Sequence, residues 1–286
     1  MSTEQPQSSV QSSLTLLDRS VVVVLPRPND TASRRHKISA RVERLHRLHG
    51  TSVLFEVSKL LELGASTYAT ACSIFHRFFH NASLTEFDVW SISLASLMLA
   101  TKVEEEPQPL VKIIHGFCHT YRKRLLVLDL SKLEEDDRWD WNYSGLRFVK
   151  EATTWSKERK LKFLHEQPLP GKLGPVFEDW HKQALDSEAA VLRQLGFTLY
   201  WIPDSHPHKF ILYFCQALGL AQLPFLQRAW NYCNDSCRLD LCTRFTPEVI
   251  VRMEIYVLCS VMNGSTPSRI PHRILVPFTR PLARCL

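Results

Sequence analysis

GASTYATACSIFHRFFHNASLTEFDVWSISLASLMLATKVEEEPQP, residues 64–109, is the stretch that decides the fold. Between residues 66 and 79 the apolar or small side chains recur every three or four positions, which predicts an amphipathic helix with one face on a core. The run from Val89 to Thr101 contains no charged residue, so a helix there must be buried on nearly every side. It is too short to cross a bilayer, which takes about twenty apolar residues. The stretch therefore predicts an all-α bundle built around a central helix.

Charge is concentrated at the end of that central helix. Thr85 and Asp88 precede the helix with the spacing of a capping box. Lys102 lies in its last turn, where a cation suits the negative end of the helix dipole. Three glutamates at 104–106 and prolines at 107 and 109 follow, and the prolines stop any continuation of the helix. We interpret this charged tip as the working surface.

Several segments resemble the cyclin box, in the form found in transcription-associated cyclins. ATACSIFHRFF (69–79) and LASLMLATKVEE (94–105) carry the resemblance first, and SEAAVLRQLGFTL (187–199) is similar to the fifth helix of the box. HPHKFILYFCQAL (206–218) and AWNYCNDSCRLDLCTRFTPE (229–248) resemble the second repeat of cyclins L, K, T and Q. Cyclins L and Q are the nearest in pattern, and the lack of a long arginine-serine tail favours cyclin Q. The resemblance covers roughly residues 50–121 and 180–262.

The periodicity divides the chain into two helical repeats. Helices expected at 51–63, 109–121 and 179–197 complete a first cyclin box within residues 36–200, and 38–49 is expected to add a basic amphipathic helix. Residues 1–35 are rich in Ser, Gln, Thr and Pro, which is typical of a disordered leader. Residues from about 122 to 179 form an insertion, and four tryptophans lie in it or directly after it, at positions 139, 141, 155 and 180. The insertion is either packed by its own aromatic residues or serves to dock a partner.

The second repeat is expected to be incomplete. Helices predicted at 224–239 and 247–261 mirror the pair at 66–79 and 86–101, which indicates an internal repeat over residues 201–262. Arg252 and Glu254 lie where the corresponding helix of the first repeat is uncharged. Residues 263–286 contain several prolines and no pattern for two further helices, so we expect an irregular tail.

Composition and charge limit the classes of function. The chain has 286 residues and a formal charge of +6, and seven basic against two acidic residues lie between Arg27 and Arg47. The rest is nearly neutral, which disfavours direct nucleic-acid binding by the folded part. The basic arm is interpreted as a solvated leader, as a nuclear-targeting signal at SRRHK (33–37), or as a contact to a kinase or nucleic acid. No phosphate-binding glycine loop, kinase catalytic motif or secretory signal occurs, so no cofactor and no membrane contact are expected.

Two groups of residues could be considered for metal binding. His115, Cys118 and His119 could share a helix face, and Cys233, Cys237 and Cys242 cluster in the second repeat. Neither group has the paired CxxC spacing of a zinc site. Buried cysteines that act as small apolar residues explain both groups better, so no metal is expected.

The resemblance implies a regulatory subunit, not an enzyme, that binds and activates a cyclin-dependent protein kinase in transcription or the cell cycle. It implies a nuclear location, with a cytoplasmic one as the alternative. By match to the family, kinase contacts fall on Lys102 at the end of the third box helix, on Glu188 in the fifth, and on apolar residues beside them: Leu192, Phe197 and Leu199. The alternative is a pseudo-cyclin, or a helical adaptor of the general transcription factor type, that does not activate a kinase.

Overall fold

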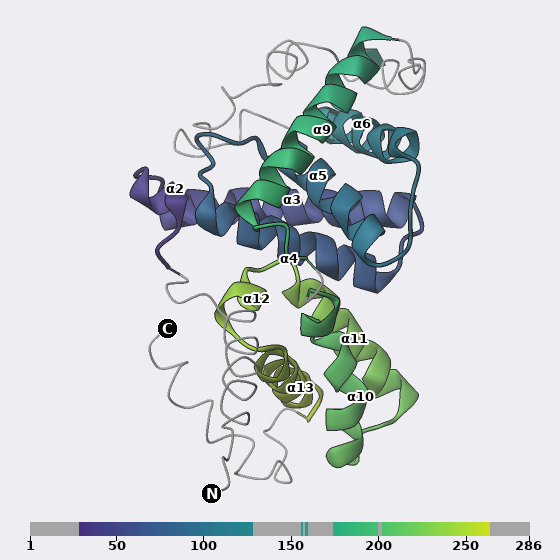
Figure 1. Ribbon diagram of the computed structural model, residues 1–286. Helices are drawn as coiled ribbons and strands as arrows, with labels where there is room; N and C mark the ends of the chain where they lie inside the picture. The colour runs from purple at the N-terminus through teal and green to yellow at the C-terminus, as the bar shows by residue number, and fades with distance from the viewer. Residues whose placement is uncertain (1–28, 128–155, 157, 160–173, 200–201, 264–286) are drawn as a thin grey trace, which may run out of the picture. The chain divides into compact units, whose positions relative to one another are not determined.

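The computed structural model describes residues 29–127, 156, 158–159, 174–199 and 202–263, and every regular element in that part is a helix (Figure 1). The prediction of an all-α fold is thereby confirmed for the described residues. They fall into two compact units, one of residues 29–203 and one that begins at residue 204. The predicted limits of the two repeats, 36–200 and 201–262, stay predictions, although the division between the units lies close to them.

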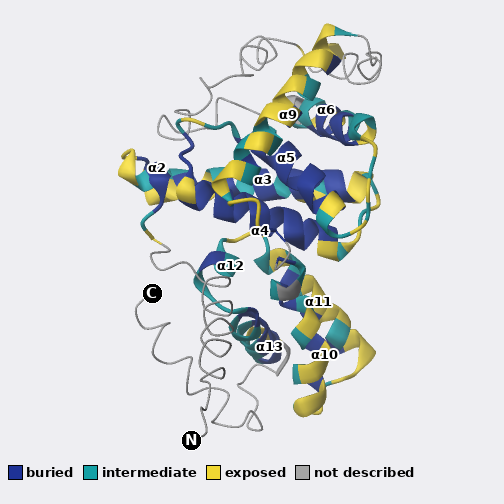
Figure 2. Cartoon of the chain, in the orientation of Figure 1, coloured by how far each residue is buried: buried dark blue, intermediate teal, exposed yellow. Residues whose placement is uncertain are grey.

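The first unit is built around one central helix. It contains α2 (Ala32–Arg35), α3 (Ala40–Leu60), α4 (Ala65–Asn81), α5 (Val89–Val103), α6 (Leu110–Val127) and α9 (Pro175–Gln194). The helix α5, which is uncharged from Val89 to Thr101, packs against α3, α4, α6 and α9. It is dark blue, and therefore buried, over most of its length in Figure 2. Its apolar side chains leave water completely or nearly so, as Leu94 and Leu97 illustrate. The absence of charge in the sequence thus predicted the centre of the bundle correctly.

The start of α5 differs from the predicted capping box. Asp88 is the N-cap, and its carboxylate accepts a hydrogen bond of 3.0 Å from the backbone N–H of Ser91. Thr85 lies further upstream, and its hydroxyl donates to Ser83 Oγ at 2.9 Å. The prediction that Thr85 caps the helix is therefore wrong, because the first helical residue is Val89 and the cap must directly precede it.

The long helix α3 joins two segments that we expected to be separate helices. Gly50 lies in its middle without breaking it. A Cβ atom at this position would lie 2.3 Å from the ring of Phe75 and 2.9 Å from Val89. Glycine is present here because α4 and α5 approach the α3 backbone closely, and that tertiary contact outweighs the low helix propensity of glycine.

The N-terminal part of the unit is folded further upstream than predicted. Residues 29–35, assigned above to a disordered leader, contain α2, and Thr31 and Ser33 are buried. Ser33 Oγ accepts a hydrogen bond of 3.1 Å from the backbone N–H of Leu84. This part of the prediction is wrong. Serine and threonine are common in disordered segments, but here the hydroxyl groups of Thr31 and Ser33 form hydrogen bonds with buried polar groups. Residues 1–28 lie outside the described part of the chain.

A buried ion pair fastens α2 and α4 to α3. Glu43 accepts hydrogen bonds from Thr31 at 2.9 Å and Arg34 at 3.1 Å, and Arg47 donates to it at 3.0 Å. Arg47 also donates to the backbone oxygen of His76 at 2.9 Å. Glu43 and Arg47 are 3% and 6% exposed. Part of the basic arm is thus a structural network and not a solvated surface.

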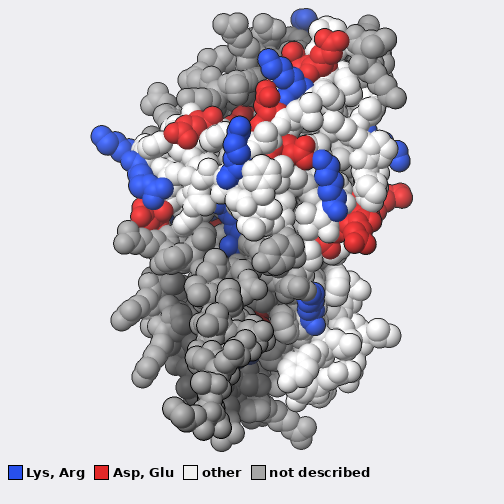
Figure 3. All heavy atoms as spheres, in the orientation of Figure 1, with Lys and Arg blue, Asp and Glu red and all other residues white. Residues whose placement is uncertain are grey.

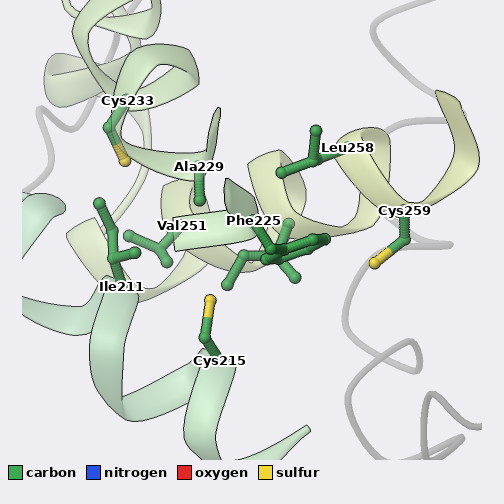
Figure 4. Close-up of a cluster of buried hydrophobic side chains, with 9 residues drawn as sticks. Ile211, Cys215, Phe225, Ala229, Cys233, Val251, Leu258 and Cys259 are labelled. Carbon is green, nitrogen blue, oxygen red and sulfur yellow. The ribbon is translucent and has the colours of Figure 1, made fainter. Parts of the chain in front are cut away.

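The second unit contains three packed helices and a short fourth one. These are α10 (His208–Ala217), α11 (Leu223–Ser236), α12 (Leu241–Arg244) and α13 (Pro247–Asn263). The core between α10, α11 and α13 is drawn in Figure 4, where Cys215 and Cys233 lie among aliphatic and aromatic side chains. Arg252 and Glu254, the two charged residues noted above in this helix, both have partners. Cys233 donates to the Glu254 carboxylate, and Arg252 lies over the ring of Phe214 at 5.6 Å.

The two ends of the predicted insertion belong to the first unit. α6 continues to Val127, and α9 begins at Pro175. Trp180 of α9 packs on a cluster formed by Ile114, Cys118 and Phe177. The other three tryptophans lie outside the described residues, as does the irregular tail from residue 264.

Candidate functional site

The structure brings together the two charged residues predicted to bind a partner. Lys102 lies in the last turn of α5 and Glu188 in the second half of α9. Lys102 Nζ lies 2.6 Å from Glu188 Oε1, and the side chains are 58% and 16% exposed. These residues are 86 positions apart in sequence, so the packing of α9 on α5 creates the pair. At the surface, the Lys102 ammonium group is accessible, whereas the Glu188 carboxylate is mostly buried.

The three predicted apolar contact residues differ in exposure. Leu192 follows Glu188 by one turn of α9 and is half-buried, whereas Leu199 is buried. Phe197 is 68% exposed. Because Leu199 already packs within the fold, Phe197 and the accessible part of Leu192 are the apolar surface that remains available to a partner.

The C-terminus of α9 explains the position of Phe197. The N–H of Gly196 donates to the Arg193 oxygen at 3.2 Å, and the N–H of Phe197 donates to the Leu192 oxygen at 2.9 Å, as in a Schellman motif. Gly196 and Phe197 both have positive φ angles, 65° and 58°. The left-handed region costs a non-glycine residue about 1 to 2 kcal/mol. A large apolar side chain is thus held in a strained backbone and exposed to water, a combination that indicates a contact surface.

The acidic residues that follow Lys102 have a different role from the one we predicted. Glu106 accepts hydrogen bonds from the backbone N–H of Gly64 at 3.1 Å and from Thr67 Oγ1 at 2.6 Å. Glu104 accepts a hydrogen bond from Thr70. Two of the three glutamates of the charged tip therefore hold α4 against the end of α5, and Glu105 is exposed at a φ of 56°.

The cap formed by Glu106 was missed at the level of the sequence. Gly64 is the N-cap of α4 and has no side chain that could satisfy the first backbone N–H groups. A glycine N-cap therefore indicated that another residue must supply the acceptor, but the sequence does not show which distant residue does so. Of the charged residues of the tip, Lys102 and Glu105 are therefore the two that stay exposed.

Burial shifts several pKa values within the first unit. Burial, followed by the charge of Arg124, lowers the pKa of His49 to about 3. Burial also raises the pKa of Cys118 to about 12, so the neutral thiol prevails and is a poor nucleophile or metal ligand. His49 is neutral near pH 7 and stacks edge-on against Trp90, with 5.6 Å between the ring centres. These groups stabilise the bundle and do not form part of the surface around Lys102.

Neither metal binding nor membrane insertion finds a site among the described residues. No group of three or more His, Cys, Asp or Glu side chains there could hold a metal ion, which includes the described residues around Cys118 and Cys233. None of the described helices combines the length and apolar character needed to span a membrane. In Figure 3, blue basic and red acidic side chains alternate on the visible face of the first unit.

Comparisons with known proteins find similar sequences. Residues 23–132 match the family described as cyclin, N-terminal domain. Cyclin-L2 of Mus musculus is 29% identical over 231 residues, which are 80% of this chain and 36% of that protein. Cyclin-L1 of Homo sapiens is 28% identical over 231 residues, which again are 80% of this chain and 36% of that protein. This chain thus spans about a third of the length of the curated relatives that it matches.

A solved structure has a similar fold. It is a chain of the crystal structure of the yeast RNA Pol II CTD kinase CTDK-1 complex, with a TM-score of 0.55 and 12% sequence identity. The likeness covers 83% of this chain and 61% of that chain, and it concerns the fold. The predicted similarity to cyclin L is confirmed, whereas the preference for cyclin Q stays a prediction. Residues 23–132 thus match the N-terminal domain of cyclins, and 80% of the chain is similar to the L-type cyclins.

Proposed function

We propose that this chain is a regulatory subunit that binds and activates a cyclin-dependent protein kinase and has no catalytic activity of its own. The observation that carries the proposal is the surface of α5 and α9, where the Lys102–Glu188 pair joins the two helices and the exposed ring of Phe197 follows the C-terminus of α9. Charge and apolar area side by side are suited to a helix and a loop of a partner protein. The resemblance to cyclins supports a kinase as that partner.

The proposed mechanism uses the surface as a rigid support. The regulatory helix of the kinase packs on Phe197 and Leu192, which turns it inward so that the Lys–Glu ion pair of the kinase forms over ATP. Lys102 is accessible enough to bind an acceptor of the kinase while it keeps Glu188 in place. Leu199 supports the turn that carries Phe197 from within the fold. The subunit thus changes which state of the kinase is populated, and supplies no reacting group.

A role in transcription and a nuclear location follow as part of the same proposal. The L-type cyclins are transcription-associated relatives, and the solved structure with a similar fold comes from a complex described as an RNA Pol II CTD kinase. Both support a kinase of the transcription class over one of the cell cycle. The identity of the kinase is open to direct measurement.

The test begins with affinity purification of the full chain and identification of the kinase that co-purifies. Lys102→Glu and Glu188→Lys are then compared with two matched charge reversals, Lys112→Glu on α6 and Glu178→Lys on α9, both at exposed positions. Removing one member of a charge pair at an interface typically costs about 2 to 5 kcal/mol of binding. Surface changes typically alter stability by less than about 0.5 kcal/mol. We expect the Lys102 and Glu188 variants to lose kinase binding while their melting temperatures stay close to that of the parent protein. Both control variants should retain kinase binding.

The double variant Lys102→Glu with Glu188→Lys separates an interface role from an internal one. It restores an ion pair within the chain but inverts the charges that a kinase meets. Renewed binding and activation by the double variant would show that the pair acts only inside the fold. Kinase binding without activation by the parent protein would instead support the adaptor or pseudo-cyclin alternative.

A further inference from the structure

The outward face of α6 gathers basic and imidazole side chains. Five residues lie along this side at positions about one helical turn apart: Lys112, His115, His119 and the neighbours Arg122 and Lys123. Lys112, His119 and Lys123 are exposed, and the other two are half-buried. The opposite side of the helix, with Ile113 and Phe117, is buried in the core of the first unit. We call the five residues the α6 stripe.

The stability of the helix does not account for the α6 stripe. α6 contains no aspartate or glutamate, although opposite charges one turn apart would stabilise a helix and like charges weaken it. Lys112 lies in the first turn, where the helix dipole disfavours a cation. Within the part of the chain that the structure describes, the side chains of Lys112 and His119 have no ion pair or hydrogen bond. Lys123 shares the Glu56 carboxylate with Arg124, at 3.8 and 2.9 Å. The positive charge of the stripe is therefore available to an anionic partner.

The length and the borders of the α6 stripe favour a short peptide over a nucleic acid. The helix rises about 16 Å from Lys112 to Lys123, and an extended peptide places alternate side chains about 6.6 Å apart. About two or three anionic side chains of a peptide can therefore lie over the stripe. The exposed acids Glu178 and Asp179 adjoin Phe177, whose ring centre lies 6.3 Å from that of His115. A nucleic acid that extends past the stripe would meet these carboxylates, which repel its phosphates.

Phosphate groups match the mixture of cations and imidazoles better than carboxylates do. A phosphoserine carries nearly two negative charges and three acceptor oxygens, so one group can accept bonds from a lysine and from an imidazole at once. An imidazole keeps an N–H donor in both of its protonation states. We propose that the α6 stripe binds a segment of a partner protein that contains two phosphoserines separated by one residue. The stripe lies on a different helix from the proposed kinase surface of α5 and α9, and its binding does not depend on a kinase.

Fluorescence anisotropy with the purified full chain tests the choice of ligand. The probe is a labelled short peptide with two phosphoserines separated by one residue. It is compared with the same peptide carrying serine, the same peptide carrying aspartate, and a single-stranded RNA of similar length. We expect the phosphopeptide to bind about tenfold or more tightly than each of the other three, because hydrogen bonds to a phosphate are charge-assisted. No binding of the phosphopeptide, equal binding of the aspartate peptide, or equal or tighter binding of the RNA would each overturn the proposal.

A pair of double variants tests the position of the site. Lys112→Glu with His119→Glu reverses the charge of the α6 stripe, and both positions are exposed, so the melting temperature should stay close to that of the parent protein. Lys37→Glu with Arg44→Glu is the matched control at exposed basic residues before and within α3. We expect the stripe variant to lose about tenfold or more of its affinity for the phosphopeptide, and the control to keep it.

Equal losses in the two double variants, or no loss in the stripe variant, would show that the phosphopeptide binds elsewhere. Kinase binding by the stripe variant should persist, since the proposed kinase surface contains neither substituted residue. A failure of the peptide assay is thereby distinguished from a failure of the proposed function.

Discussion

Phe197 combines two features that do not favour the folded state by themselves. Its ring is 68% exposed, and its backbone lies in the left-handed region next to Gly196. The left-handed turn is compensated by hydrogen bonds that close the C-terminus of α9, from Gly196 N–H to the Arg193 oxygen and from Phe197 N–H to the Leu192 oxygen. The turn explains the backbone but not the aromatic ring. The ring is therefore the part of the residue to test for binding.

We predict that Phe197→Asn keeps the fold and weakens kinase binding. Asparagine adopts the left-handed conformation more readily than phenylalanine, so the free energy of unfolding should stay equal or rise by up to about 1 kcal/mol. Loss of the ring should reduce kinase affinity by about tenfold or more, as is usual for an aromatic anchor. Thermal melting and a quantitative pull-down measure the two effects. Leu185→Asn, at another exposed site of α9, is the control, and equal binding by both variants would remove Phe197 from the interface.

At the scale of elements, α4 depends on an acceptor from outside the helix. Glu106 accepts bonds from Gly64 N–H and Thr67 Oγ1 across 42 and 39 residues of sequence. We predict that Glu106→Ala lowers the free energy of unfolding by about 0.5 to 2 kcal/mol, the usual value of a lost N-cap. Kinase binding should persist under conditions where the variant is folded. The neighbouring Glu105→Ala is the matched control in urea denaturation, and equal midpoints for the two variants would contradict the capping role.

The short helix α2 is a second element that stabilises the first unit through its contacts. Thr31 and Arg34 both donate to Glu43, which is paired with Arg47 inside the unit. Deleting residues 1–28 leaves these bonds intact, whereas deleting residues 1–35 leaves the Glu43 carboxylate with fewer donors. We predict no change for the shorter deletion and a loss of about 1 to 3 kcal/mol for the longer one. Equal denaturation midpoints for the two deletions would show that α2 does not stabilise the first unit.

At the scale of the whole molecule, the second unit carries a buried acid, Glu254, which accepts a hydrogen bond from the thiol of Cys233. Burial raises the pKa of Glu254 above its ordinary value of 4.5, against the opposing effect of its hydrogen bond with Cys233. The unfolded chain releases this proton more readily than the folded one. The unit is therefore stabilised by the neutral acid at low pH, and this contribution is lost as the pH rises above 4.5 toward the raised value.

We predict that Glu254→Gln becomes more stabilising, relative to the parent, as the pH rises above 4.5. Glutamine stays neutral and can accept the hydrogen bond of Cys233. The comparison of the two proteins at each pH cancels other groups, such as His208, whose pKa burial lowers to about 4. Hydrogen exchange of residues in α13 between pH 5 and pH 8 measures the difference. A difference that does not vary with pH would show that Glu254 titrates normally.

The sequence by itself determined the kinds of helices and the resemblance to cyclins. The uncharged run that became α5, the three-and-four spacing of α4, and the motif that ends in Lys102 are local patterns, and helix periodicity makes such patterns readable without a structure. The resemblance also selected Lys102, Glu188, Leu192, Phe197 and Leu199. The helix boundaries near Gly50 and Thr85 were predicted incorrectly, because the average conformational preferences of these residues are outweighed by tertiary contacts.

Only the tertiary structure decided which side chains meet. Lys102 and Glu188 form a pair because α9 packs on α5, and Glu106 caps α4 because the turn after α5 reaches Gly64. Arg34 and Arg47 look in the sequence like part of a solvated basic arm, yet both bind Glu43. Exposure of Phe197 and burial of Leu199, two residues further on, likewise depend on the turn at Gly196. The contacts of Lys102 with Glu188 and of Glu106 with Gly64 join residues 86 and 42 positions apart, and local periodicity carries no information about partners at that separation.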